Sequence, residues 1–155
     1  MSKALDLYDR QEFLQCLQCA VCTGSCPTAR VVPGFSPRDI ILRYILFGEQ
    51  DEVLESPDLW TCTTCHACQE RCPHEICISG LLTHIMNLAA RRGNLPSALK
   101  SGVRLMAETG WSVPAPPRAD RVREELGLKP LKRPDTEEIR AIFREAGLDE
   151  ILDLP

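Results

Sequence analysis

The sequence predicts an all-α protein, and three observations support this. Helix start and stop signals flank several segments in which apolar residues recur at helical spacing. Few segments show the strict alternation of apolar and polar residues that a half-buried strand needs. Aromatic residues make up only 5% of the 155 residues and prolines number 12, which favours short helices over a sheet.

The first well-marked helix lies between two groups of cysteines. Ser36 is a good N-cap residue, Pro37 suits the first helical position, and Gly48 marks the end. The apolar residues gather on one face at helical spacing; they are Ile40, Ile41, Tyr44, Ile45 and Phe47. A second, short helix is expected over residues 49–54, ahead of a Ser-Pro pair.

The region after the second group of cysteines repeats this organisation. A broad apolar stripe over residues 79–92 predicts a helix; its members are Leu81, Leu82, Ile85, Met86, Leu88 and Ala89. Arg91 and Arg92 stand beside the negative end of its dipole, and Gly93 ends it. A further helix is expected over residues 96–108. The order of a cysteine group followed by a helix occurs twice along the chain, which indicates a duplicated unit.

The composition changes after Trp111. The sequence Val-Pro-Ala-Pro-Pro over residues 113–117 cannot continue a helix and predicts an extended linker. Two modest amphipathic helices are expected beyond it, over residues 119–126 and 135–146, each followed by a glycine. The tail, residues 148–155, is too short for a core of its own and would pack back on its domain or dock on a partner. We therefore expect a cysteine-bearing domain over residues 1–112 and a linker with a helical extension over residues 113–155.

Eight of the nine cysteines form two copies of one pattern, with matched positions 46 residues apart. Each copy spaces its cysteines as C-x2-C-x2-C-x3-C and ends in proline. The first run is Cys16, Cys19, Cys22, Cys26 and Pro27, and the second is Cys62, Cys65, Cys68, Cys72 and Pro73.

This spacing predicts ligands for two [4Fe-4S] clusters. A run with ligands three residues apart wraps around one cluster and supplies three thiolates, while its fourth cysteine ligates the other cluster in two-cluster ferredoxins. The expected interlocked ligand sets are Cys16, Cys19, Cys22 and Cys72 for cluster 1, and Cys62, Cys65, Cys68 and Cys26 for cluster 2.

Other uses of eight cysteines fit less well. Structural zinc usually takes two Cys-x2-Cys pairs separated by a longer loop, whereas each run here holds four cysteines close together. Disulfides need an oxidising compartment, and the start MSKALDLYDR has no apolar export segment. The net charge of −4 argues against nucleic-acid binding, and no apolar stretch is long enough to cross a membrane. We expect a cytoplasmic protein.

Several residues outside the ligand sets allow two interpretations. Cys77 is expected to be a small buried hydrophobic residue, the alternative being a spare ligand or redox-active thiol. His66 and His74 are expected near the second cluster, where they could donate hydrogen bonds to sulfur. Trp60 could shield that cluster from water. Five basic residues could balance cluster charge or meet acidic partner surfaces, although solvated surface charge is the commoner explanation; they are Lys3, Arg30, Arg38, Arg43 and Arg71.

No catalytic motif stands beside the cysteines. The sequence lacks a Gly-rich phosphate loop, a GxGxxG fingerprint, a Ser/His/Asp set and an open-site metal motif. Four thiolates per cluster leave no coordination position for a substrate. We expect a chain that carries electrons and has no catalytic residue of its own.

The two tandem runs, the Pro-Arg-Asp helix between them and the sequence WTCTTCHACQERCP at residues 60–73 resemble the C subunit of the heterodisulfide reductase of methanogenic archaea, over about residues 10–110. The resemblance implies an α-helical ferredoxin fold, related to the C-terminal cluster domain of succinate dehydrogenase iron-sulfur subunits. The motif is shared with glycolate oxidase and anaerobic glycerol-3-phosphate dehydrogenase subunits. A chain without a [2Fe-2S] domain or a fused catalytic domain is most similar to the heterodisulfide reductase protein.

The resemblance also implies a role and partners. The chain would relay electrons from a flavin-containing A subunit to a catalytic B subunit that reduces the coenzyme M–coenzyme B heterodisulfide, with or without a hydrogenase or formate dehydrogenase module. Only the eight cysteines of the two runs are carried over from the family. The alternatives are a relay in a related heterodisulfide-reductase-like or quinone-linked dehydrogenase complex, and an iron-sulfur redox sensor.

Overall fold

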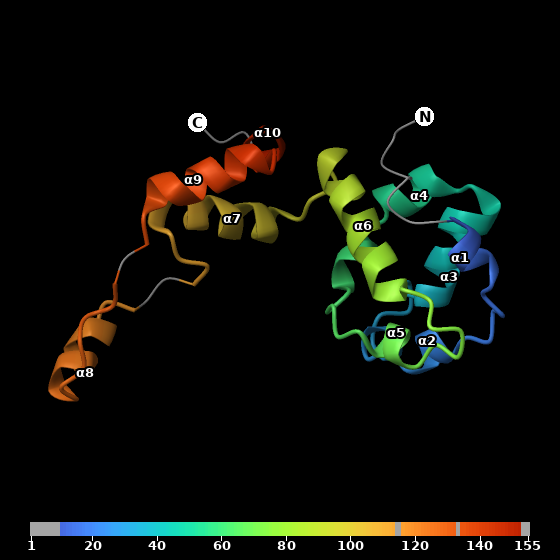
Figure 1. Cartoon of the computed structure of the whole chain (residues 1–155), viewed down its shortest axis with the longest axis horizontal. Coiled ribbons are helices and arrows are strands. Elements are labelled where there is room, and N and C mark those ends of the chain that lie inside the picture. Colours follow the sequence, from blue (N-terminus) through green and yellow to red (C-terminus); the bar gives the residue numbers. More distant parts are fainter. Residues whose placement is uncertain (1–9, 114–115, 133, 153–155) are drawn as a thin grey trace. The chain divides into compact units, whose positions relative to one another are not determined.

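The computed structural model of the chain describes residues 10–113, 116–132 and 134–152, and these contain helices and no strand. The prediction of an all-α fold is confirmed. The contacts divide the chain into two compact units, Met1–Asn94 and Leu95–Pro155 (Figure 1). Among the described residues, no helix combines the length and the apolar character that crossing a membrane requires.

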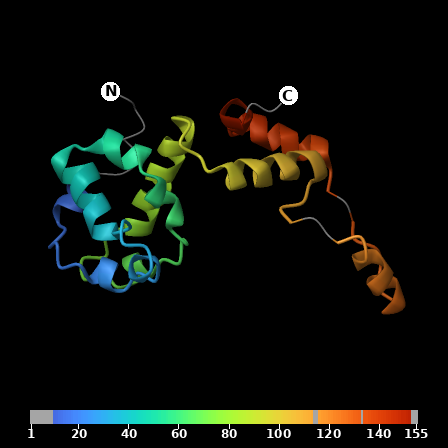
Figure 2. The same ribbon diagram turned by 180° about the vertical axis from the view of Figure 1, so that it is seen from behind.

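The first unit carries all nine cysteines on short helices and the loops between them. Its elements are α1 (Arg10–Leu14), α2 (Val21–Gly24), η2 (Thr28–Arg30), α3 (Pro37–Ile41), η3 (Leu42–Phe47), α4 (Gln50–Glu55), η4 (Pro57–Thr61), α5 (Ala67–Glu70) and α6 (Ile78–Arg91). The two short helices α2 and α5 contact each other and lie side by side at one end of the unit, seen from behind in Figure 2.

The helix between the two cysteine runs begins as its sequence predicts. The Ser36 hydroxyl accepts a hydrogen bond from the Asp39 N–H at 3.1 Å, and Pro37 occupies the first turn. Gly48 ends the segment in the left-handed region, at φ 76°. The helix is α-helical over its first five residues and π-helical over the next six, so η3 is wider than the predicted regular helix.

The core of the first unit is built mainly by α6 and by the α3–η3 segment. The apolar stripe predicted on α6 is its buried face, with Leu81, Leu82, Ile85 and Ala89 at most 1% exposed. Opposite them lie the buried side chains Phe13, Ile41, Tyr44, Ile45, Val53, Leu54 and Leu59. Full burial of such a side chain contributes about 1.5–3 kcal/mol, so this core holds the cysteine-bearing loops in place.

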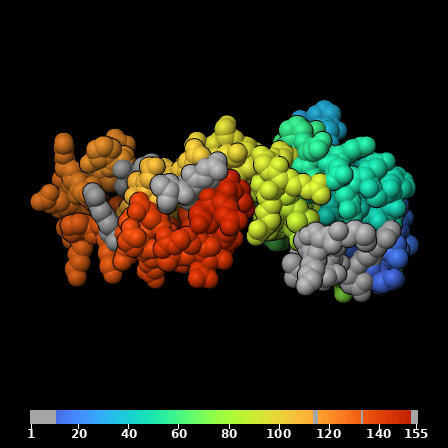
Figure 3. All heavy atoms as spheres, turned by 90° about the horizontal axis from the view of Figure 1, so that it is seen from above, coloured from blue at the N-terminus to red at the C-terminus, as the bar shows by residue number. Residues whose placement is uncertain are grey.

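The second unit contains α7 (Ser97–Thr109), α8 (Ala119–Glu125), α9 (Thr136–Glu145) and α10 (Leu148–Leu152). Helix α9 packs against α7 and α10, and Figure 3 shows their atoms in contact. Arg104 Nη2 donates to the Leu152 carbonyl at 2.8 Å, and Leu152 is 1% exposed. The described part of the tail therefore packs on its own unit. Residues 153–155 lie outside the described residues.

The division between the units falls at a different place from the expected domain boundary after residue 112. Helix α7 belongs with the second unit because it packs on α9, where Arg140 Nε donates to the Ala107 carbonyl at 3.2 Å. The extension therefore begins one helix earlier than its proline content suggests. Positions 114 and 115 of the expected linker lie outside the described residues. The same holds for the segment before Arg10, which contains most of the start of the chain that lacks an apolar export segment.

Candidate iron-sulfur sites

Two pockets in the first unit are each lined by four cysteines. The first pocket has an empty volume of about 340 Å³, including solvent at its mouth. Three of its cysteines come from the first run and one from the second; they are Cys16, Cys19, Cys22 and Cys72. This is the set of thiols expected for cluster 1.

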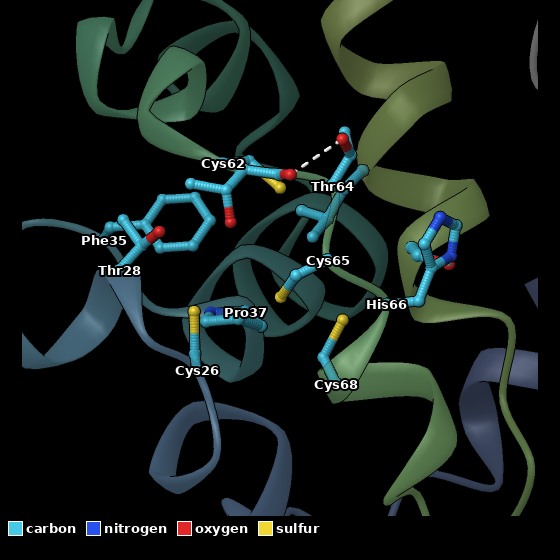
Figure 4. A pocket seen from close by; sticks show the side chains of 12 residues that line it. Cys26, Thr28, Phe35, Pro37, Cys62, Thr64, Cys65, His66 and Cys68 are labelled. Atoms are coloured by element: carbon cyan, nitrogen blue, oxygen red, sulfur yellow. Dashed lines mark hydrogen bonds between the residues drawn. The ribbon is translucent and has the colours of Figure 1, made fainter.

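The second pocket has an empty volume of about 370 Å³. Its cysteines are Cys62, Cys65 and Cys68 of the second run together with Cys26 of the first run. Figure 4 shows the sulfur atoms of these four side chains directed toward a common space. The fourth cysteine of each run therefore lies with the other run, as a crossed ligation requires, although ligation itself stays a prediction.

The backbone bends in the same way within each run. Gln18 and Thr64 occupy equivalent positions 46 residues apart and have φ values of 58° and 51°. Ala20 and His66, also 46 apart, have φ values of 62° and 61° and precede α2 and α5. Left-handed residues other than glycine are uncommon and cost about 1–2 kcal/mol. Their recurrence at matched positions indicates that wrapping the chain around each pocket requires them.

Two long-range hydrogen bonds join the repeats around the pockets. The Thr28 hydroxyl, two residues after Cys26, donates to the Thr61 carbonyl at 3.2 Å, just before Cys62. The Cys77 N–H donates to the Glu12 carboxylate at 2.8 Å, which ties α1 to the chain after the second run. These bonds hold the two runs together from both sides.

The second and third cysteines of the two runs differ in burial in the same way. The second cysteine of each run, Cys19 or Cys65, is exposed, and the third, Cys22 or Cys68, is buried. Each pocket therefore has one exposed thiol and at least one buried thiol, and in the second pocket Cys26 is buried as well.

The surroundings shift the pKa values of several thiols. Burial raises the pKa of Cys22 and of Cys62, and it raises the pKa of Cys68 to about 11, with further contributions from Cys62 and Cys22. The Ala67 N–H and the Thr63 hydroxyl lower the pKa of the exposed Cys65.

His66 lines the second pocket, but its ring is held by a hydrogen-bond chain. Ser79 Oγ donates to Gln69 Oε1 at 2.5 Å, which uses the only hydroxyl hydrogen. Ser79 therefore accepts the bond from His66 Nδ1–H, at 3.0 Å. Figure 4 shows the ring directed away from the four sulfur atoms. The sequence suggested a hydrogen bond from a His66 N–H to sulfur. Nδ1 does not make this bond, because it donates to Ser79.

Other residues near the pockets differ from the expectations. His74 lines the first pocket and not the second, because Cys72, two residues before it, lies with the first run. Trp60 packs against the core and is not among the residues that line the second pocket. The aromatic side chain that lines this pocket is Phe35, which is 2% exposed. Cys77 lines neither pocket and is half-buried. The sequence did not indicate Phe35 as a pocket residue, because it is distant in sequence from the second run.

The thiol sets suit iron-sulfur clusters. Four thiolates per pocket are the usual complement of a [4Fe-4S] cluster. Gln18 Nε2 donates to Cys16 Sγ at 3.2 Å, the kind of bond that stabilises sulfur bound to iron. Among the described residues, no three His, Cys, Asp or Glu side chains form a group that could hold a single metal ion. The assignment rests on the two pockets and the donor chemistry.

A helical fold that brings eight cysteines of two interlocked runs around two pockets defines an iron-sulfur protein of the ferredoxin type. In agreement, the family model of the 4Fe-4S dicluster domain matches residues 12–76. That segment runs from α1 to the residue before Cys77 and includes both cysteine runs.

Curated relatives identify the family more narrowly. The chain is 38% identical to the second iron-sulfur C subunit of the CoB–CoM heterodisulfide reductase of Methanocaldococcus jannaschii, over 88% of this chain and 75% of the relative. It is 37% identical to the C subunit of the H(2):CoB-CoM heterodisulfide,ferredoxin reductase of Methanothermobacter marburgensis, over 88% and 76%. It is also 37% identical to the C subunit of the ferredoxin:CoB-CoM heterodisulfide reductase of Methanosarcina mazei, over 90% and 89%. The chain belongs to the family of heterodisulfide reductase C subunits.

The metal content of the purified protein follows from the two thiol sets. Protein purified without oxygen is expected to contain about eight iron and about eight sulfide per chain. Iron, zinc and acid-labile sulfide are measured on the same sample. Zinc with little sulfide would contradict the cluster assignment.

Proposed function

We propose that this chain is the electron-relay subunit of a heterodisulfide reductase complex, and that it has no catalytic activity alone. It would pass electrons from a flavin-containing subunit to the subunit that reduces the coenzyme M–coenzyme B heterodisulfide in methanogenesis. Membership of the family supports the complex, since the relatives are named as subunits of such reductases. The relay role is supported by the two linked thiol sets.

Residues Cys16, Cys19, Cys22 and Cys72 would hold one [4Fe-4S] cluster, and Cys26, Cys62, Cys65 and Cys68 the other. When bound, each cluster would supply reversible one-electron chemistry. The short helices α2 and α5 connect the two sets, because each begins beside a cysteine of one set and ends shortly before a cysteine of the other. The crossed arrangement is the observation that carries the proposal, since it makes the two sites one continuous unit.

Each site also reaches the surface, as a relay between two partners requires. Cys19 and Cys65 are exposed at equivalent positions of the two runs, while Cys22, Cys26 and Cys68 are buried. The exposed cysteines give each site its own access to solvent. A donor and an acceptor could therefore meet different sites of the same chain.

A relay and a sensor are distinguished by cycling the isolated protein between redox states. The anaerobic protein is expected to be reduced by dithionite and reoxidised by a mild dye over several cycles, with its iron and sulfide retained. It is expected not to cleave the heterodisulfide, because four thiolates per cluster leave no position for a substrate. Absorbance follows reduction, and thiol release follows cleavage. Loss of iron on each oxidation would favour the sensor alternative.

A further inference from the structure

The two pockets differ in the charge of their lining. Arg38 and His74 line the first pocket together with Cys16, Cys19, Cys22 and Cys72. Among the described residues that line the second pocket there is no arginine or lysine, and His66 is its one basic residue. Two repeats with matched cysteines therefore present their sites with different electrostatic surroundings.

Arg38 is fixed to the first cysteine run by its backbone. It lies in the first turn of α3, and its N–H donates to the Thr23 hydroxyl at 3.1 Å. Thr23 directly follows Cys22, and its hydroxyl lies 3.1 Å from that of Ser36, the N-cap residue of α3. The start of α3 and the first run are therefore one hydrogen-bonded assembly, which sets the place of the Arg38 side chain beside the pocket.

Arg38 is partly buried, lines the first pocket and has an unpaired donor. Its Nε is buried and has no hydrogen-bond partner, and none of the ion pairs among the described residues includes it. Arg43, five residues later, shows the contrast, because it binds Glu49 at 2.8 Å and Glu52 at 2.5 Å. A buried donor without an acceptor is costly, which points to an acceptor inside the first pocket.

The residue two positions after the first cysteine also differs between the two runs. The Gln18 amide donates to Cys16 Sγ at 3.2 Å in the first site. The equivalent residue of the second run is Thr64, and its hydroxyl donates to the Thr63 carbonyl at 2.8 Å and not to a sulfur atom. Hydrogen bonds to ligand sulfur stabilise its negative charge.

We propose that Arg38, assisted by Gln18, gives the first site the higher reduction potential of the two, so that an electron entering the chain rests at the set Cys16, Cys19, Cys22 and Cys72. Reduction adds one negative charge to a site. A fixed positive charge beside a partly buried site stabilises the reduced state more than the oxidised state. This inference rests on the proposed function, since it needs both sites to hold clusters.

The test is an anaerobic potentiometric titration of the full-length protein, followed by electron paramagnetic resonance. Cys72→Ser and Cys26→Ser assign the two signals to the first and second sites. Arg38→Gln is expected to lower the ratio of reduced to oxidised centre at the first site about tenfold at a fixed potential, a shift of about 59 mV for a one-electron couple. The second site should keep its potential, and Arg38→Lys should restore most of the shift.

Arg43→Gln is the matched control, because Arg43 lies on the same helical segment but is paired with Glu49 and Glu52. It should leave both potentials unchanged. Three results would overturn the inference. The Arg38→Gln variant could shift the potentials of both sites equally, or it could retain its full iron content and shift neither potential. The first site of the wild-type protein could also have the lower potential of the two. If the Arg38→Gln variant does not retain iron, the Gln18→Thr variant is titrated instead. A first-site potential below that of the wild-type protein supports the inference, and an unchanged potential overturns it. A wild-type protein with fewer than two centres would instead contradict the proposed function.

Discussion

Cys26→Ser is expected to remove the same spectroscopic centre as Cys65→Ser, although the two cysteines belong to different runs. Cys26 lines the pocket of Cys62, Cys65 and Cys68, and its sulfur is directed into that space (Figure 4). Loss of one of four thiolates should release that cluster and lower the iron content from about eight to about four per chain. Iron analysis and electron paramagnetic resonance of the reduced variants measure this.

The reciprocal pair is Cys72→Ser and Cys19→Ser, which should affect the other centre because both residues line the first pocket. Cys77→Ser is the control, since Cys77 lines neither pocket, and it should keep both centres. If Cys26→Ser instead removed the centre lost in Cys19→Ser, each run would bind its own cluster. The crossed arrangement would then be wrong.

Electron transfer through an assembled complex should stop when either site is lost. When the flavoprotein partner and the heterodisulfide-reducing partner are both present, Cys19→Ala or Cys65→Ala is expected to lower heterodisulfide reduction to the level of a complex without this chain. Each substitution removes a ligand from one of the two linked sites, so the path between the partners is interrupted. Flavin reduction should remain, because it precedes the relay. Absorbance of the flavin and release of thiols measure the two steps separately.

Cys77→Ala is again the matched control and should retain full transfer, since it removes a thiol that lines neither pocket. Iron analysis of each assembled variant confirms that only the intended site is lost. Full transfer in a complex lacking this chain, or heterodisulfide reduction by the chain alone, would contradict the relay proposal.

The helices of the chain were largely predictable because their signals are local. Ser36, Pro37 and Gly48 lie next to the backbone groups that they cap or release, so their roles follow from position. The apolar stripe of α6 became its buried face, because side chains three and four residues apart share one side of a helix. The Asp135 side chain likewise caps α9 by accepting from the Glu137 N–H.

Features that depend on distant segments were less predictable. Phe35 lines the pocket of the second run although it lies 27 positions before Cys62, and no local pattern indicates this. His74 lies at the first pocket because the chain crosses over at Cys72. The unit boundary at Asn94 depends on α7 packing against α9, whereas the proline-rich segment suggested a later one.

The sequence by itself determined the all-α class, the order of the main helices, the iron-sulfur chemistry and the family. These depend on residue type and short-range spacing, and the spacing of thiols within a run is enough to indicate a cluster. Only the tertiary structure decided what surrounds each set of cysteines. The two runs have the same spacing, yet Arg38 lies at one pocket, and Phe35 with the bonded pair His66 and Ser79 lies at the other. Charge and burial around a site come from segments that folding brings together, and spacing along the chain does not encode them.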